Sequence, residues 1–277
     1  MRLAHCSIAL QIAGGLGWLP ATAAAQSATC VCPGADATCS CPNQPAGSAA
    51  YSAAFGLGAH FKSEGVATRL GRIAFVQGSA PPAYSRSAAA PGVSKTLAIV
   101  PDTFPTPTLF VNAINVRSHV ASRGIEIDSI SSAGDAKLNT LGLTLNLNPP
   151  PPTANGNGPV PQPFLALSAT DVASSASFDR VFPSANTTTG SASFGSLSIS
   201  GSLVGDKTLT FSGVAPRNTV LFQSATVTIT LDEQVQAGLI TCDLTCHFIP
   251  VGIITDAIDV ELHNANLKGM LSAATSW

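Results

Sequence analysis

Few side chains in this sequence could act as acids, bases or nucleophiles, and they are far apart along the chain. The pool for a hydrolase consists of His119, His263, Glu126, Asp232 and Glu233. The sequence contains no His-Glu-x-x-His motif and no Gly-x-Ser-x-Gly nucleophile elbow. We therefore assign no catalytic residue, and a secreted hydrolase whose site assembles from distant residues is the alternative function.

Calcium binding is a second chemistry that the carboxylates suggest. Asp232 and Glu233 close an alternating segment, and Asp243 follows after a short interval. Calcium takes about six to eight oxygen ligands, so three carboxylates could contribute to such a site. A charged strand end beside a turn explains the same pattern more simply, and we assign no metal ligand and no cofactor.

Six cysteines follow the first 25 residues: Cys30, Cys32, Cys39, Cys41, Cys242 and Cys246. An even number in an exported chain is typical of disulfides. A hairpin turning through residues 33–38 places Cys30 opposite Cys41 and Cys32 opposite Cys39, and opposed residues about 4.5 Å apart can be bridged. We predict these two nested bridges in a Cys-rich hairpin segment, residues 26–48, and a third bridge from Cys242 to Cys246. A thiolate zinc cluster is the alternative, which an oxidising compartment disfavours.

The first 25 residues have the order of a secretory signal peptide. Met1–Arg2 is a short positive start, Ser7–Leu19 is mostly apolar, and Ala21–Ala25 is rich in small residues. The apolar stretch is shorter than the roughly 20 residues that span a bilayer. We expect cleavage near Ala25 and no transmembrane helix, and a mature protein that is secreted or held at the cell surface, with the periplasm as the alternative.

The composition favours a folded chain and excludes nucleic acid as a partner. Hydrophobic residues make up 45% of the 277 residues and charged residues only 10%. Soluble domains carry about 25% charged residues on average, so this chain is not disordered by excess charge. The formal net charge of −2 leaves no basic surface for nucleic acid. Partners are therefore expected among cell-envelope or other surface components.

Apolar and polar residues alternate along several segments. The clearest are Ile114–Val120, Leu141–Leu147, Thr226–Leu231 and Ile258–His263. A period of two predicts half-buried strands. In the last segment, we expect Ile258, Val260 and Leu262 to be buried and Asp259, Glu261 and His263 to be exposed. Helical periodicity is hard to find, so the prediction is an all-β fold: an antiparallel β-sandwich with long Pro/Gly-rich loops.

Two stretches rich in proline are expected to be loops. Residues 149–163 contain seven prolines, and residues 78–92 combine Pro81, Pro82 and Pro91 with a run of alanines. Proline cannot donate a ladder hydrogen bond. The first stretch divides the strands into two halves, each of which would make only a small core. We therefore predict one β-sandwich domain over residues 49–277 with a long Pro-rich loop.

Two further structural roles are compatible with alternating strands. Trp277 ends a strand-like segment, as in small outer-membrane β-barrels, but such barrels carry aromatic girdles that two tyrosines and one retained tryptophan cannot supply. Thr226, Thr228 and Thr230 form a row that would bind ice or a polymer if it were flat and exposed.

Three segments of the C-terminal third occur in a recognisable order: Asn218-Thr219-Val220, then Thr226–Gln234, then Ile258–His263. Together with Tyr51–Leu57 they resemble the choice-of-anchor P family of bacterial exported and surface proteins. Members of that family show an Asn-Thr element, a Val-Thr-Leu-Asn-Glu-Gln-like strand and a late strand that ends in His. The resemblance implies an exported β-rich domain and transfers no catalytic residue.

The sequence as a whole predicts an exported, non-catalytic β-rich bacterial protein with a structural, adhesive or cell-envelope interaction role. The secreted hydrolase is the first alternative, and the small outer-membrane β-barrel is the second.

Overall fold

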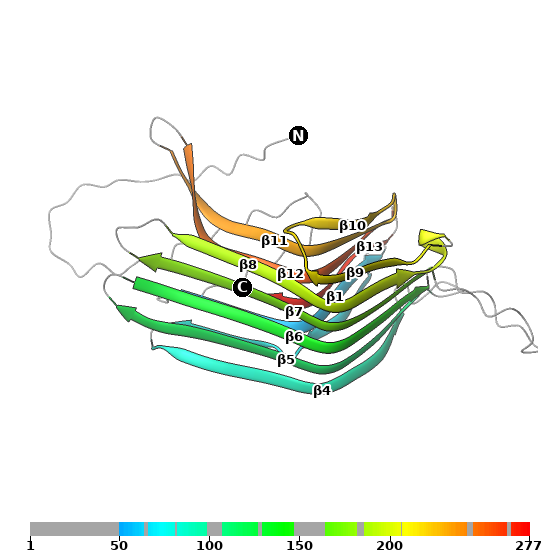
Figure 1. Ribbon diagram of the computed structural model, residues 1–277, viewed down its shortest axis with the longest axis horizontal. Helices are drawn as coiled ribbons and strands as arrows, with labels where there is room; N and C mark the ends of the chain where they lie inside the picture. The colour runs from blue at the N-terminus through cyan, green and yellow to red at the C-terminus, as the bar shows by residue number, and fades with distance from the viewer. Residues whose placement is uncertain are drawn as a thin grey trace, which may run out of the picture.

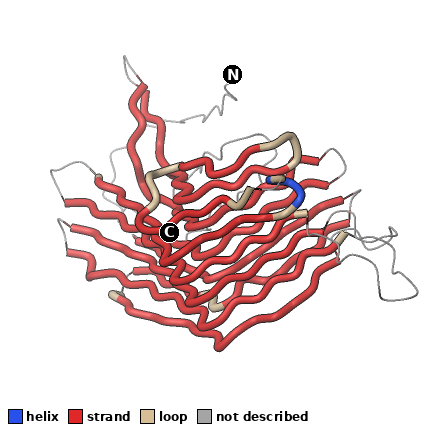
Figure 2. Tube along the Cα trace, turned by 45° about the vertical axis from the view of Figure 1, so that its right-hand side comes forward, coloured by secondary structure: helices blue, strands red, loops and turns tan. Residues whose placement is uncertain are grey.

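The computed structural model describes residues 50–63, 66–80, 82–98, 107–126, 129–146, 164–181, 186–205, 207–242, 246–264 and 267–277. Two antiparallel sheets pack face to face, as Figures 1 and 2 show, and the predicted all-β sandwich is confirmed. The predicted signal peptide (residues 1–25), the Cys-rich segment (residues 26–48) and the Pro-rich stretch 149–163 lie outside the described residues.

The seven-stranded sheet joins the two ends of the described chain. Its order is β10 (Thr219–Gln223), β11 (Val227–Cys242), β12 (Cys246–Asn264), β13 (Leu267–Ser276), β1 (Ala50–Ser63) and β2 (Val66–Ile73), and β3 (Val76–Ala80) also pairs with β1. The first and last strands of the chain are therefore neighbours in the middle of this sheet.

The six-stranded sheet is a meander of consecutive strands. Its order is β4 (Tyr84–Ala98), β5 (Thr108–Glu126), β6 (Ser129–Asn146), β7 (Leu165–Val181), β8 (Thr187–Ser200) and β9 (Leu209–Val214), with the 3₁₀ turn η1 (Ser202–Val204) between the last two. Strands from both sides of residues 149–163 occur in each sheet, and one hydrophobic cluster lies between the sheets.

The alternation seen in the sequence defines the inner faces of the sheets. Leu141, Leu143 and Leu145 of β6 are buried, as are Val227, Ile229 and Leu231 of β11 and Ile258, Val260 and Leu262 of β12. Each of these side chains leaves water by packing against the opposite sheet, and full burial of one such side chain contributes about 1.5–3 kcal/mol.

The alternation breaks once in the middle of each long strand, and we call this line of breaks the crease. The buried positions of β5 are Leu109, Val111 and Ala113 and then Val116, Ser118 and Val120, and those of β7 are Leu165, Leu167 and Ala169 and then Val172, Ser174 and Ala176. The step of three is accompanied by a left-handed backbone at Asn115, Asp171, Asp232 and Ala274, in β5, β7, β11 and β13. The strand pairing continues in the same register on both sides of these residues. The left-handed residues therefore redirect the side chains without adding a residue to the strand, and the strands are visibly bent in Figures 1 and 2.

The loop expected over residues 78–92 is a wrong prediction for most of that stretch. Residues 78–80 end β3 and residues 84–92 form the first part of β4. Pro91 is tolerated because β4 lies at the edge of its sheet, where Pro91 faces no second partner strand. Its neighbours Ala90 and Gly92 pair normally with β5.

The 3₁₀ turn η1 is the sole helical element among the described residues, and no helix there has the length and apolarity needed to cross a membrane.

Candidate functional site

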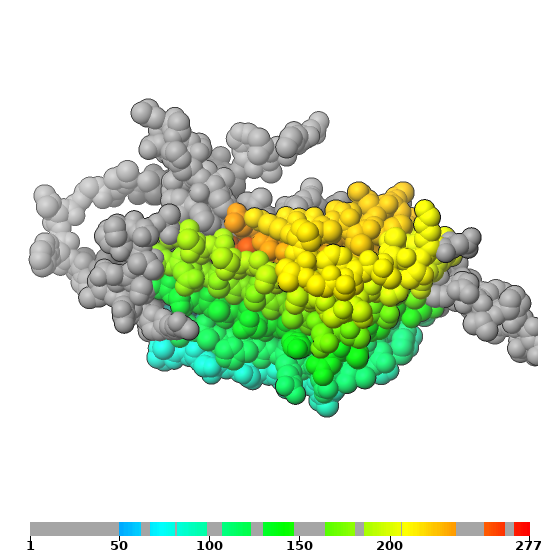
Figure 3. Space-filling view, in the orientation of Figure 1, coloured from blue at the N-terminus to red at the C-terminus, as the bar shows by residue number. Residues whose placement is uncertain are grey.

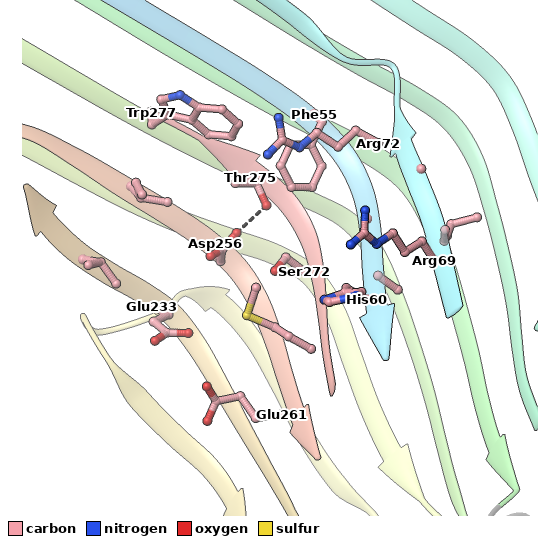
Figure 4. Close-up of a pocket in the computed structure, with 17 residues that line it drawn as sticks. Phe55, His60, Arg69, Arg72, Glu233, Asp256, Glu261, Ser272, Thr275 and Trp277 are labelled. Carbon is pink, nitrogen blue, oxygen red and sulfur yellow. Dashed lines mark hydrogen bonds between the residues drawn. The ribbon is translucent and has the colours of Figure 1, made fainter. Parts of the chain in front are cut away.

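A cavity of about 620 Å³ lies on the outer face of the seven-stranded sheet (Figure 4). Its floor comes from the positions of β11, β12, β13 and β1 whose side chains point away from the core. The lining residues that carry charged, polar or aromatic groups are Phe55, His60, Arg69, Arg72, Glu233, Asp256, Glu261, Ser272, Thr275 and Trp277. A cavity of this size lies within the range of about 300–1,000 Å³ that small ligands occupy in proteins.

Three carboxyl groups gather at one side of this cavity, and we call them the acidic triad: Glu233, Asp256 and Asp259. One oxygen of each lies within 4.8 Å of the others. Asp256 and Asp259 are buried, whereas Glu233 is half-buried. Three carboxyl groups this close repel one another unless a proton or a cation intervenes.

The crease explains how the triad forms. In a regular strand, Asp256 and Asp259 would point to opposite faces, because their separation of three is odd. The crease lies between them, so both side chains point outward on β12, while Ile258 points into the core. The left-handed backbone of Asp232 likewise turns Glu233 outward on β11, opposite Asp256 in the register.

Hydroxyl groups from β13 contact two members of the triad. Thr275 donates a hydrogen bond to Oδ1 of Asp256, as the dashed line in Figure 4 shows, and Ser272 donates one to Oδ1 of Asp259 at 3.3 Å. Oδ2 of Asp259 is buried and accepts no hydrogen bond from any N–H or O–H donor in the described part of the chain. The carboxyl group of Glu233 lies beside that of Asp259, and the two form a hydrogen bond when one of them carries a proton.

Burial raises the pKa of every carboxyl group in the triad. The pKa of Asp256 rises from 3.8 to about 7, because burial outweighs the stabilising hydrogen bond from Thr275. The pKa of Asp259 is well above its usual range, through burial and the charges of Glu233 and Asp256. Burial also raises the pKa of Glu233, and the nearby Glu261 adds to the rise. Near neutral pH, the triad therefore favours keeping at least one proton or binding a cation.

The opposite side of the cavity is basic and aromatic. The guanidinium of Arg72 stacks over the rings of Phe55, Phe75 and Trp277 at 5.1–5.4 Å from their centroids. The rings of Phe55 and Trp277 meet edge to face at 5.7 Å. Arg69 comes from the same strand, β2, and Figure 4 places both arginines across the floor from Glu233 and Glu261.

The acids predicted from the sequence are only partly brought together. Glu233 joins the triad, but Asp232 accepts a hydrogen bond from Gln234 instead and does not line the cavity. Asp243 and the side chain of Glu126 lie outside the described residues. The expected exposure of Asp259 is wrong, since its side chain is 1% exposed beneath the floor of the cavity.

The two histidines of the proposed hydrolase pool lie on different sheets. His119 of β5 contacts Ser85 at 3.0 Å and Asp135 at 3.7 Å, whereas His263 of β12 contacts Thr228 at 3.0 Å and Glu261 at 3.5 Å. Neither lines the cavity, so the predicted pool does not form one site among the described residues.

The row of threonines expected from the sequence does not form. Thr228 and Thr230 are half-buried in β11, and Thr226 precedes that strand, so the three threonines do not make one flat exposed row.

The register places Cys242 opposite Cys246 at the end of the β11–β12 hairpin. The side chains of these two cysteines, like residues 30–41, lie outside the described residues, and all three disulfides stay predictions.

No sequence pattern singles out Asp256, His60, Arg69 or Arg72, because alternation alone does not place these residues on a common surface. A usable signal was the polar residue in the middle of a strand, because Asn and Asp adopt the left-handed backbone more readily than most residues. Asn115, Asp171 and Asp232 all mark the crease in this way. A search of family models, curated proteins and solved structures finds no match to this chain.

Proposed function

We propose that this protein is an exported, non-catalytic β-sandwich that binds a mixed-charge component of the cell envelope in the cavity on its seven-stranded sheet. The observation that carries the proposal is the separation of charge across one cavity. Arg69 and Arg72 stand on β2, and Glu233, Asp256 and Glu261 stand on β11 and β12. Two strands, β13 and β1, lie between the two groups.

The spacing defines the ligand class. Neighbouring strands lie about 4.8 Å apart, so β12 and β2 are separated by roughly 14 Å. A purely anionic ligand would be repelled by the carboxylates, and a purely cationic ligand by the arginines. A ligand that carries both charges, with a ring or apolar part for Phe55 and Trp277, satisfies both sides.

Peptidoglycan is the envelope polymer whose chemistry fits these features. Its stem peptides carry amino and carboxylate groups, and its sugar rings offer faces that can pack on aromatic side chains. The export signal expected from residues 1–25 supports the same compartment.

Co-sedimentation with purified peptidoglycan sacculi tests the proposal, with cellulose as the uncharged control polymer. The wild-type chain is expected to pellet with sacculi and not with cellulose. Arg69→Ala is expected to reduce the bound fraction about tenfold, since a charge-assisted contact contributes about 1.5–3 kcal/mol. Arg117→Ala, on the outer face of the other sheet, is the matched control and keeps full binding. Absence of pelleting, or equal losses in both variants, contradicts the proposal.

A secreted hydrolase is the second candidate, and one observation favours it. Asp256 lies in the cavity floor with a pKa raised by burial to about 7, which suits a general acid or base at neutral pH. Incubation with sacculi distinguishes the two functions. Release of soluble fragments by the wild-type chain, but not by Asp256→Asn, supports hydrolysis, and binding without release supports the first proposal.

A further inference from the structure

The acidic triad concentrates negative charge that the surrounding protein does not balance. Asp256 and Asp259 are buried side by side with Glu233, and Glu261 adds a fourth carboxyl group nearby. The ion pairs that join His119 to Asp135, Lys137 to Asp171 and His263 to Glu261 include no member of the triad. The arginines of the cavity stand on β2, three strand spacings from β12. Burial of unpaired carboxylates is costly, so a counter-charge is needed when they ionise.

One atom of the triad points to a missing partner. Oδ2 of Asp259 is fully buried and has no hydrogen-bond donor, although Oδ1 of the same carboxyl group accepts a bond from Ser272. Buried polar atoms in folded proteins nearly always have a partner. The carboxyl groups of Asp259 and Glu233 lie together and form a hydrogen bond when one of them is protonated. When both are ionised, a cation shared by the two groups takes the place of that proton.

The ligand chemistry selects the kind of cation. All three groups offer oxygen atoms, and hydroxyl oxygens of Ser272 and Thr275 adjoin them. Oxygen-only sites suit the hard cations Ca²⁺ and Mg²⁺ rather than Zn²⁺. Ca²⁺ accepts mono- and bidentate carboxylates in irregular geometry, whereas Mg²⁺ demands a near-ideal octahedron and usually binds only one or two carboxylates. The open cavity gives water access to complete the coordination shell.

We propose that Glu233, Asp256 and Asp259 form a calcium site at the floor of the cavity, with Ser272 and Thr275 orienting the two aspartates. The site differs from the calcium ligands considered from the sequence, because Asp256 and Asp259 take the places of Asp232 and Asp243. It does not depend on what the cavity binds.

Isothermal titration calorimetry of CaCl₂ into the purified, EDTA-treated chain tests the site without any envelope ligand. We expect one Ca²⁺ per chain with a Kd of about 10⁻⁴–10⁻³ M, the range of extracellular calcium modules. Calcium is also expected to raise the Tm, since it binds the folded state. Asp259→Asn is expected to weaken calcium binding by more than about tenfold, because a neutral amide replaces a charged ligand.

Asp232→Asn is the matched control, since it removes a neighbouring buried carboxylate that does not belong to the triad, and Asn tolerates the same left-handed backbone. This variant is expected to bind calcium like the wild type. If Asp259→Asn does not fold, Glu233→Gln replaces it and must show the same weakening. The proposal is overturned if the wild type shows neither binding nor a Tm rise in millimolar CaCl₂, which would leave a shared proton in the triad. It is also overturned if Mg²⁺ binds as tightly, or if the triad variant and Asp232→Asn bind alike. Co-sedimentation with sacculi, measured once in EDTA and once in calcium, then tests envelope binding separately from calcium binding.

Discussion

The outer faces of the two sheets differ in how they treat polar side chains. On the six-stranded sheet, whose outer face is seen in Figure 3 as bands from cyan β4 to yellow β9, hydroxyl groups pair across neighbouring strands. Thr170 meets Ser196 at 2.9 Å, Ser175 meets Ser191 at 2.9 Å, and Ser177 meets Thr189 at 2.6 Å. On the seven-stranded sheet, carboxylates and arginines surround a cavity, and two of the carboxylates are buried.

The difference shows that the groups that are unfavourable for stability are concentrated on the outer face of the seven-stranded sheet. Exposed hydroxyl pairs satisfy each other or water at little cost. Buried carboxyl groups with raised pKa values are unfavourable in the ionised form, and such groups cluster at functional sites. The seven-stranded sheet is therefore the face on which function is to be sought.

The largest expected effect tests the core that supports both faces. Ile258→Ala, directly behind the acidic triad, is expected to lower the free energy of unfolding by about 2–5 kcal/mol, because the side chain is fully buried. Ile114→Ala is the control, since this isoleucine is 45% exposed on the outer face of the other sheet and its loss should change stability by less than about 1 kcal/mol. Urea unfolding followed by circular dichroism measures both, and equal effects would contradict the assignment of faces.

The next effect is the pH dependence of stability in EDTA. The pKa of Asp256 rises from 3.8 to about 7 on folding, so the folded chain binds more protons than the unfolded chain between these values. The contribution of Asp256 to the free energy of unfolding is therefore fully present below pH 3.8 and is lost as pH rises through about 7. This loss is at most roughly 4 kcal/mol. Glu233 and Asp259 act in the same direction.

Urea midpoints of the wild type and of Asp256→Asn across this pH range measure the contribution of Asp256. The variant is expected to lose less stability toward neutral pH, because its amide cannot ionise. A wild-type stability that instead increases over the same range would show that the triad is not held in its protonated form.

A smaller effect is expected at the aromatic end of the cavity. Arg72→Ala removes the cation from three rings and should lower stability by about 1 kcal/mol, the contribution of an exposed cation–π contact. Arg117→Ala, on the other sheet, serves as the control and should change stability by less than about 0.5 kcal/mol. Indistinguishable urea midpoints for the two variants would contradict a stabilising role for the contacts between Arg72 and the three rings.

The smallest effect is expected in the hydroxyl pairs. Ser175→Ala and Ser191→Ala form a double-mutant cycle whose coupling energy should stay below about 0.5 kcal/mol, because both groups can turn to water. The double variant should also pellet with sacculi like the wild type. A large coupling, or lost pelleting, would assign a role to the six-stranded face.

Much of the fold is predictable from local pattern. The alternation of Thr226–Leu231 and Ile258–His263 predicts the buried faces of β11 and β12, because a period of two places every second side chain in the core. The same rule fails where a strand crosses the crease. It predicts that Ile114 is buried with Val116 and Val120, although Ile114 is exposed. It also gives no reason for the side chain of Asp256 to face outward. Proline also misleads in β4, since only the strand order shows that Pro91 lies on an edge.

By itself, the sequence determined the class of the fold and the inner residues of individual strand segments, because both follow from side-chain period and composition. It contains both acidic residues of β12, Asp256 and Asp259, but it does not indicate that their carboxyl groups lie close together. Only the tertiary structure decided that they share a surface with Glu233, since this requires the left-handed backbone of the crease and the pairing of β11 with β12. Only the sheet order placed Arg69 and Arg72 across the floor from them, because β1 and β13, from opposite ends of the described chain, lie between.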